Sequence, residues 1–205
     1  MTKIKLCGLK RACEIEWVNE LKPDYIGFVF SKKSRRYVNP EEAGKLKAML
    51  HSSIKAVGVF VDAKPEVIAG MAELEVIDAV QLHGNEDEAY LRELKKLIKI
   101  PVFQAFRITS AEDVKRAEES SADMVLLDAG AGCGEVFDWS LLKDMKRPYF
   151  LAGGLTPENV SDAIDRLQPY GVDASSSLER SGVKEKEKMT AFLEAVRGKE
   201  IKDGR

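Results

Sequence analysis

Short apolar runs alternate with amphipathic segments along the whole sequence, and this alternation limits the fold more than any other feature. Most runs are nearly continuous in apolar residues, as in Ala56-Val-Gly-Val-Phe-Val61, which is typical of parallel strands buried on both faces. The segments between them carry apolar residues on one helical face and charged residues on the other. Eight strands are predicted: Lys3–Cys7, Tyr25–Phe30, Ile54–Val61, Ala79–Leu82, Val102–Phe106, Met124–Asp128, Tyr149–Ala152 and Gly171–Ala174.

Each predicted strand is followed by a helix or by a segment long enough to hold one. The alternation therefore predicts an α/β protein with a single (β/α)8 TIM barrel, as one domain over residues 1–205. A doubly wound open sheet is the alternative architecture. The predicted helices include Pro40–Leu50, Asn85–Ile98, Ala111–Ser120 and Thr156–Leu167, with starts indicated by Asn39 before Pro40, Ser110 before Asp113, and Thr156 before Pro157.

An aspartate recurs beside the starts of four predicted strands, which indicates a weak internal repeat. The four positions are separated by about two strand–helix units, as a barrel built from similar pieces would require. They are Asp24, Asp78, Asp123 and Asp173.

The balance of charge excludes several classes of partner. With 32 basic and 34 acidic residues the formal net charge is −2, so neither a nucleic acid nor a membrane surface is an expected partner. No apolar run approaches the ~20 residues that span a bilayer, and no signal-peptide pattern is present. Cys7, Cys13 and Cys133 are odd in number and lack metal-ligand spacing, so we expect a cytoplasmic protein without a metal site.

In a barrel of this kind, reactive groups lie at the carboxyl ends of the strands. The first strand ends in Cys7, which is either a catalytic thiol or a buried cysteine of the usual kind. The sixth ends in Asp128 after an apolar run, where a carboxyl is either a general acid or a cap. His83, at the end of the fourth strand, is either functional or a packed, hydrogen-bonded residue. Arg36, in the loop after the second strand, either binds a carboxylate or is solvated.

The loops after the seventh and eighth strands together predict a phosphate site. Gly153 and Gly154 allow an anion to approach the backbone closely, and a helix start is indicated just after them. The run Ser175, Ser176 and Ser177 supplies backbone N–H groups and hydroxyls. Two ordinary tight turns are the alternative explanation.

Several motifs, in this order and spacing, resemble the phosphoribosylanthranilate isomerase family of tryptophan biosynthesis. The resemblance runs nearly from end to end of the chain. It rests on Lys5-Leu-Cys-Gly-Leu9, Tyr25-Ile-Gly-Phe-Val-Phe30, Ser34-Arg-Arg-Tyr-Val38, Val57-Gly-Val-Phe-Val61, Val80-Gln-Leu-His-Gly84, Phe137-Asp-Trp139 and Leu151-Ala-Gly-Gly-Leu155.

The resemblance implies a cofactor-free Amadori rearrangement of N-(5-phosphoribosyl)anthranilate, a phosphorylated small molecule. Asp128 would be the general acid that opens the furanose ring to an iminium, and Cys7 the general base that removes the proton from C2. Arg36 would hold the anthranilate carboxylate, and the loops after the seventh and eighth strands the phosphate. The expected assembly is a monomer or homodimer.

The sequence departs from the family pattern in three loops. The usual Gly-Gly-Thr-Gly-Lys is replaced by Ala131-Gly-Cys-Gly-Glu135, so Cys133 stands for threonine and Glu135 for lysine. The usual Ser-Ser-Gly-Val-Glu is replaced by Ser175-Ser-Ser-Leu-Glu179, and we expect Ser177 to need a conformation that glycine adopts more easily. The usual Pro-Gly-Val-Lys-Asp is replaced by Ser181-Gly-Val-Lys-Glu185.

Two other functions fit the same barrel. An isomerase or epimerase of a related phosphosugar would keep the phosphate site, but such enzymes characteristically use paired carboxylates rather than a thiol and a carboxyl. A phosphosugar-binding protein without turnover is consistent with the altered loops at Cys133, Glu135 and Ser177. Both proposed catalytic residues are present, so we expect an active enzyme.

Overall fold

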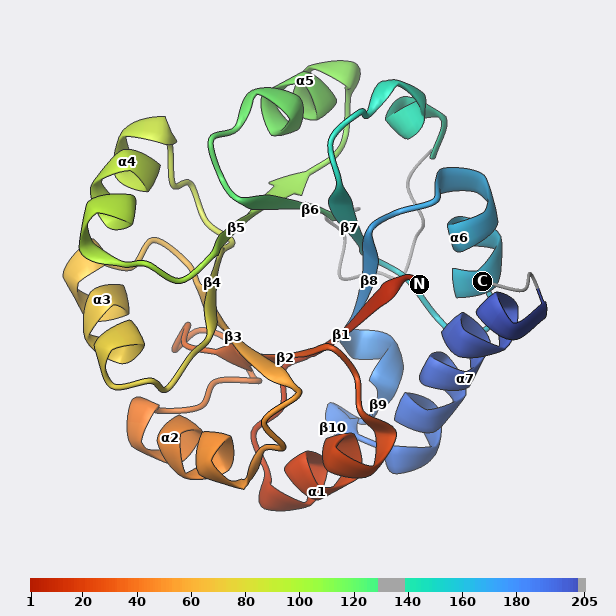
Figure 1. Cartoon of the computed structure of the whole chain (residues 1–205), viewed down its shortest axis with the longest axis horizontal. Coiled ribbons are helices and arrows are strands. Elements are labelled where there is room, and N and C mark those ends of the chain that lie inside the picture. Colours follow the sequence, from red (N-terminus) through yellow and green to blue (C-terminus); the bar gives the residue numbers. More distant parts are fainter. Residues whose placement is uncertain (129–138, 203–205) are drawn as a thin grey trace.

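The structure, a computed structural model, describes residues 1–128 and 139–202. Eight parallel strands form a closed barrel in sequence order, and β8 pairs with β1 to complete it. Helices surround this barrel as a ring (Figure 1). The predicted (β/α)8 barrel is therefore confirmed, and the open doubly wound sheet is excluded by the β1–β8 pairing. A single domain over residues 1–205 stays a prediction.

The strands of the barrel agree closely with the predicted ranges, five of them to the residue. They are β1 Lys3–Cys7, β2 Tyr25–Val29, β3 Lys55–Phe60, β4 Ala79–Leu82, β5 Val102–Arg107, β6 Met124–Asp128, β7 Tyr149–Ala152 and β8 Gly171–Ala174. A two-stranded antiparallel hairpin, β9 Glu179–Arg180 and β10 Val183–Lys184, follows β8.

The helices are α1 Ala12–Leu21, α2 Pro40–Met49, α3 Pro65–Glu73, α4 Glu88–Leu97, α5 Ala111–Glu119, α6 Val160–Leu167 and α7 Lys186–Lys202, with 3-10 segments η1 Trp139–Asp144 and η2 Ser176–Leu178. Two predicted caps are confirmed, since Asn39 accepts from the Glu42 N–H and Ser110 forms a reciprocal capping box with Asp113. None of the helices in these described ranges is long and apolar enough to cross a bilayer.

The predicted start of a helix at Thr156 is wrong, because α6 begins at Val160. Asn159 holds the preceding residues in a turn: its Oδ1 accepts from the Thr156 N–H at 2.8 Å, and its Nδ2 donates to the Gly154 carbonyl at 2.9 Å. The Thr156 carbonyl in turn accepts from the N–H groups of Asn159 and Val160, so the chain leaving β7 makes one turn before the regular helix begins.

The repeated aspartates lie at the amino-terminal ends of the strands, with one exception. Asp24, Asp78 and Asp123 each precede an even-numbered strand and accept a hydrogen bond from the backbone N–H of the preceding odd-numbered strand, at Ile4, Ala56 and Val102 respectively. Asp173 is different, because it lies within β8 and is buried. Three members of the repeat therefore stabilise the end of the barrel away from the carboxyl ends, while the fourth faces its interior.

Aromatic side chains fill the barrel interior near the amino-terminal ends of the strands. Tyr25, Phe103 and Phe150 pack against each other with ring centroids 5.6 to 5.9 Å apart. The opposite half of the interior carries smaller and polar side chains. This closes one end of the barrel and leaves the carboxyl ends of the strands to form a cavity.

Candidate active site

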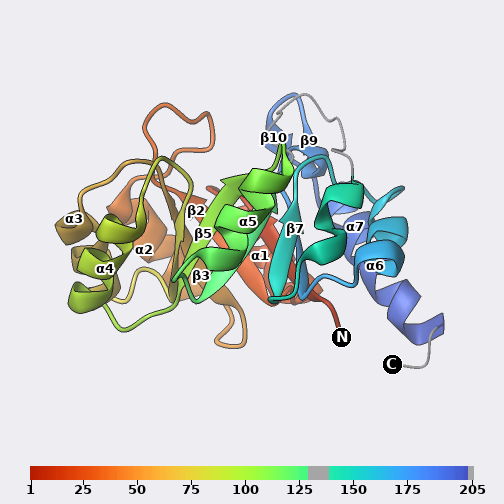
Figure 2. The ribbon, with the colours of Figure 1, turned by 90° about the horizontal axis from the view of Figure 1, so that it is seen from above.

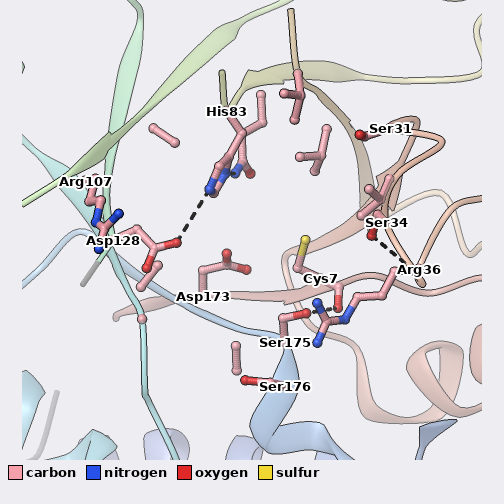
Figure 3. A pocket seen from close by; sticks show the side chains of 18 of the residues that line it. Cys7, Ser31, Ser34, Arg36, His83, Arg107, Asp128, Asp173, Ser175 and Ser176 are labelled. Atoms are coloured by element: carbon pink, nitrogen blue, oxygen red, sulfur yellow. Dashed lines mark hydrogen bonds and ion pairs between the residues drawn. The ribbon is translucent and has the colours of Figure 1, made fainter. Parts of the chain in front are cut away.

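A cavity of about 810 Å³ lies at the carboxyl ends of the barrel strands. Figure 3 shows the thiol of Cys7 and the carboxyl groups of Asp128 and Asp173 directed into the same space, with His83 above them. All nine predicted site residues line this cavity: Cys7, Arg36, His83, Asp128, Gly153, Gly154, Ser175, Ser176 and Ser177. The loops after β2, β4, β7 and β8 are thus brought together around one space.

Cys7 ends β1 with its thiol facing the interior, and the residue is only 8% exposed. Burial raises the pKa of this thiol, and the opposing effect of the Lys5 and Lys184 ammonium groups is not enough to reverse it. The protonated thiol is therefore the stable form without substrate. A cationic group in the substrate would favour the thiolate.

Gly27 of β2 is paired with Cys7 and provides the space for its thiol. A Cβ at position 27 would lie 2.6 Å from the Cys7 Sγ, well inside van der Waals contact. We expect Gly27→Ala to displace the thiol and lower kcat by about 10²-fold, since a ~1 Å misplacement has effects of that size. The added methyl group should also overpack the barrel interior and lower the free energy of unfolding by about 1–3 kcal/mol. Steady-state turnover measures the first effect, and urea unfolding measures the second.

The matched control is Gly70→Ala in α3, where a new Cβ meets nothing within 4 Å. That variant should keep full activity and gain up to about 1 kcal/mol of stability from the better helix former. Unchanged kcat in Gly27→Ala would show that the position of the thiol is not limiting.

Lys5 and Asp173 form a buried ion pair in the barrel interior, which sequence reasoning missed. The Lys5 Nζ lies 3.0 Å from the Asp173 Oδ1, and the lysine side chain is 0% exposed. The alternation of β1 contained the signal: residues two apart face the same side, so if Cys7 faces the interior, Lys5 does too. Lysines that alternate with Ile4 and Leu6 are typical of a strand with one solvated face, but Lys5 is on the interior face of the barrel.

His83 and Asp128 approach each other across the cavity. The His83 Nε2 lies 3.6 Å from the Asp128 Oδ2, and the Gln81 amide nitrogen lies 3.0 Å from the His83 Nδ1. An N–H bond from Gln81 to Nδ1 leaves the ring proton of a neutral imidazole on Nε2, facing Asp128. Gln81 therefore orients His83, and His83 in turn restrains the carboxyl group of Asp128.

Two buried side-chain oxygens at the cavity wall have no hydrogen-bond partner in the described part of the chain. They are the Oε1 of Gln81, a residue that is 1% exposed, and the Oγ of Ser177. Buried polar atoms are rarely left unpaired. Both residues line the cavity.

Arg36 bonds a carboxylate of this chain. Its Nε and Nη2 donate to the two carboxyl oxygens of Glu179 at 2.6 and 3.0 Å, a bidentate pair. The same carboxylate accepts from Lys184 at 2.7 Å and from Arg35 at 2.8 Å. Gly8 makes room for this arrangement, because a Cβ there would lie 2.4 Å from the Arg36 Cδ.

The β9–β10 hairpin carries Glu179 and Lys184 and stands at the end of the barrel opposite the amino terminus (Figure 2). Its two-residue turn has Ser181 at φ 52° and Gly182 at φ 81°. Positive φ at both positions is the requirement of a type I′ turn, which proline cannot meet. Ser181 therefore has a conformation that the family's proline could not adopt.

Burial raises the pKa of the Glu179 carboxyl, but the hydrogen bonds from Arg36 and Lys184 outweigh it and lower the pKa to about 2. Because this lies below the unfolded-state value of about 4.3, ionised Glu179 stabilises the fold above that pH. The stabilisation, about 3 kcal/mol, should be lost as the pH falls toward 2. Urea unfolding of Glu179→Gln should therefore give a free energy of unfolding that depends less on pH between these two pKa values than that of the parent. At pH 7 the free energy of unfolding should be lower than in the parent.

Glu41→Gln is the control, because Glu41 is an exposed helix residue paired only with Lys45. Its free energy of unfolding should depend on pH in the same way as that of the parent. If the free energy of unfolding changed equally with pH in the parent and in Glu179→Gln, the role of Glu179 would be contradicted.

The loops after β7 and β8 present backbone to the cavity. Gly153 and Gly154 have φ of 82° and 68°. Ser175 donates from its hydroxyl to the Cys7 carbonyl at 3.0 Å, and Lys184 donates to the Ser175 carbonyl at 2.9 Å.

The expectation of a glycine-like conformation at Ser177 is wrong: Ser177 lies in η2 without positive φ, so serine fits there without strain. Cys133 and Glu135 lie outside the described residues.

Comparisons with known proteins agree on one family. Residues 4–195 match the family described as N-(5'phosphoribosyl)anthranilate (PRA) isomerase. An N-(5'-phosphoribosyl)anthranilate isomerase from Endomicrobium trichonymphae is 42% identical over 202 residues, which cover 96% of this chain and 99% of the relative. The relative from Caldanaerobacter subterraneus subsp. tengcongensis is 43% identical over 205 residues, covering 97% and 99% of the two chains.

Solved structures give the same result. The phosphoribosyl anthranilate isomerase from Thermotoga maritima superimposes with a TM-score of 0.87 at 36% identity, covering 97% of this chain and 100% of that one. A phosphoribosyl anthranilate isomerase in complex with reduced 1-(o-carboxyphenylamino)-1-deoxyribulose 5-phosphate has a TM-score of 0.85, with the same identity and coverage. The chain belongs to the N-(5'-phosphoribosyl)anthranilate isomerase family.

Proposed function

We propose that this protein converts N-(5-phosphoribosyl)anthranilate to 1-(2-carboxyphenylamino)-1-deoxyribulose 5-phosphate in tryptophan biosynthesis, with Cys7 as general base and Asp128 as general acid. The observation that carries the proposal is the position of the two groups, since a thiol on β1 and a carboxyl on β6 line one cavity of a family member. A related structure holds the reduced form of this product. Acid–base chemistry of this kind requires one group that gives a proton to the substrate and another that removes one.

In the proposed mechanism, Asp128 delivers its proton to the furanose ring oxygen. The C1–O bond breaks and the anthranilate nitrogen donates its lone pair, which gives an open-chain iminium. Cys7 loses its thiol proton to solvent as the cation forms. The thiolate then takes the proton from C2, and the resulting enolamine tautomerises to the ketone. The iminium charge acidifies the C2–H bond and favours the thiolate, which offsets the rise in the pKa of Cys7 caused by burial.

The remaining site residues are proposed to orient the two anionic ends of the substrate. Phosphate would bind the backbone N–H groups of Gly153 and Gly154 and the run Ser175–Ser177, where the Ser177 hydroxyl is free to bond it. Arg36 would hold the anthranilate carboxylate. Since Glu179 accepts one bond each from the Nε and Nη2 of Arg36, the substrate would use the remaining N–H groups, two on Nη1 and one on Nη2.

We also propose that the reaction needs no cofactor or metal, because acid–base groups suffice for the rearrangement, and that the enzyme works in the cytoplasm. It acts as a monomer or homodimer. One relative, from Thermotoga maritima, is described as dimeric. Light scattering after gel filtration distinguishes the two states for this chain.

The test is turnover of freshly generated phosphoribosylanthranilate, followed by the loss of its fluorescence. We expect first-order consumption with the ketone as the product by mass spectrometry. A folded protein that binds the reduced product analogue but consumes no substrate would overturn the proposal in favour of a binding protein without turnover.

A further inference from the structure

The structure assigns Lys5 as a positioning residue: we propose that its buried ammonium, held by Asp173, stabilises the Cys7 thiolate during the reaction. Lys5 has no place in the mechanism above, which needs only Cys7 and Asp128. The inference rests on the proposed function of Cys7 as a base. It adds to that function a cation, the Lys5 ammonium, whose charge is opposite to that of the Cys7 thiolate.

The geometry gives Lys5 little alternative role. It lies two residues before Cys7 on β1, so both side chains face the barrel interior. Its Nζ is 3.0 Å from the Asp173 Oδ1, and the ion pair has side-chain exposures of 0% and 9%. A buried pair of this kind contributes little to stability compared with apolar side chains of the same volume, so stability alone does not account for a buried lysine beside the thiol.

The charge of Lys5 is maintained by its neighbours. Burial lowers the pKa of the Lys5 ammonium. The negative charges of Asp173 and Cys7 raise this pKa by more than burial lowers it, so Lys5 stays protonated. Proton abstraction from C2 begins with a thiolate on a residue that is only 8% exposed. A fixed cation next to the sulfur stabilises that thiolate without any reorganisation of solvent.

Other charged groups also act on Cys7. Asp173 of β8 opposes the thiolate, and Lys184 of β10 favours it more weakly than Lys5 does. Arg36, His83 and Asp128 line the same cavity from the loop after β2, from the end of β4 and from β6. Of these cations, Lys5 is the one on the same strand as Cys7, two residues away.

The experiment measures the rate of Cys7 alkylation by iodoacetamide against pH, in a Cys13→Ser, Cys133→Ser background. In Lys5→Met we expect the midpoint of this profile to move up by about one pH unit or more, the effect of losing one close opposite charge. The pH dependence of kcat/KM also reports the pKa of the group that must be deprotonated for activity. This pKa should rise by a similar amount. The control is Lys3→Met, on the same strand, where the lysine is partly exposed and pairs with Asp24 at the other end of the barrel.

Lys5→Met leaves Asp173 buried without its partner, so the variant could fail to fold. The double variant Lys5→Met, Asp173→Asn removes both charges. Its midpoint should still move up, by a smaller amount, because Lys5 acts on the thiol more strongly than Asp173 does. A midpoint that is unchanged or lowered in a folded variant would overturn the inference. Because alkylation does not depend on isomerase activity, this result is separate from failure of the proposed function.

Discussion

Replacement of Cys7 by serine is expected to lower kcat by about 10²- to 10⁴-fold, the usual range for loss of a general base. A serine hydroxyl has almost the same shape as the thiol but is a far weaker acid, so it supplies no comparable base near neutral pH. The smaller oxygen also fits the narrow space beside Gly27, where the present sulfur is tightly enclosed. KM should change little, because the thiol acts on C2 rather than on either anionic end of the substrate.

The fluorescence assay measures this effect, with Cys13→Ser as the matched control. Cys13 lies in α1 outside the cavity lining, and its replacement should leave kcat unchanged. A Cys7→Ser variant with full activity would eliminate the thiol as the base and leave the barrel and its anion sites as they are.

Asp128→Asn is expected to have an effect of similar size, because an amide has no acidic proton to give to the ring oxygen. The side chain keeps its shape, and its contact with the His83 Nε2 does not require a charge. The loss should therefore appear in kcat with the fold intact, as circular dichroism and thermal unfolding would show. Asp162→Asn is the control, since Asp162 lies on α6 and pairs with Arg166 at the surface.

Substrate deuterated at C2 separates the two roles. In Cys7→Ser, removal of the C2 proton limits the rate, so a full primary isotope effect is expected. In Asp128→Asn, ring opening comes first and becomes limiting, so the isotope effect should nearly disappear. The opposite pattern would exchange the roles of the two residues.

The barrel and the cavity lining could be predicted because they follow from local patterns. Strand ends in a parallel barrel meet at one edge, and this geometry alone brings Cys7, His83 and Asp128 to the same cavity. The interior position of Lys5 also follows from strand alternation, although the apolar face of β1 obscured it.

Other features depend on contacts that no local pattern contains. Arg36 and Glu179 are 143 residues apart, and their bidentate pair exists only because the hairpin after β8 folds over the loop after β2. The turn before α6 depends on the Asn159 side chain, which bonds the Thr156 N–H and the Gly154 carbonyl. Ser177 lies in η2 without positive φ, so the glycine of the family pattern is not a conformational requirement at that position.

The pairing of the first and last strands has a consequence for how the protein acquires its chemistry. Lys5 and Asp173 are 168 residues apart, and Ser175 binds the main chain of Cys7 across the same boundary. During synthesis the thiol is among the first residues to be made, and its partners are among the last. Joining ends so distant in sequence carries a large entropic cost that only the assembled ring offsets. The ionic surroundings of the thiol therefore form only when the ring closes, which makes Cys7 reactivity a direct reporter of complete folding.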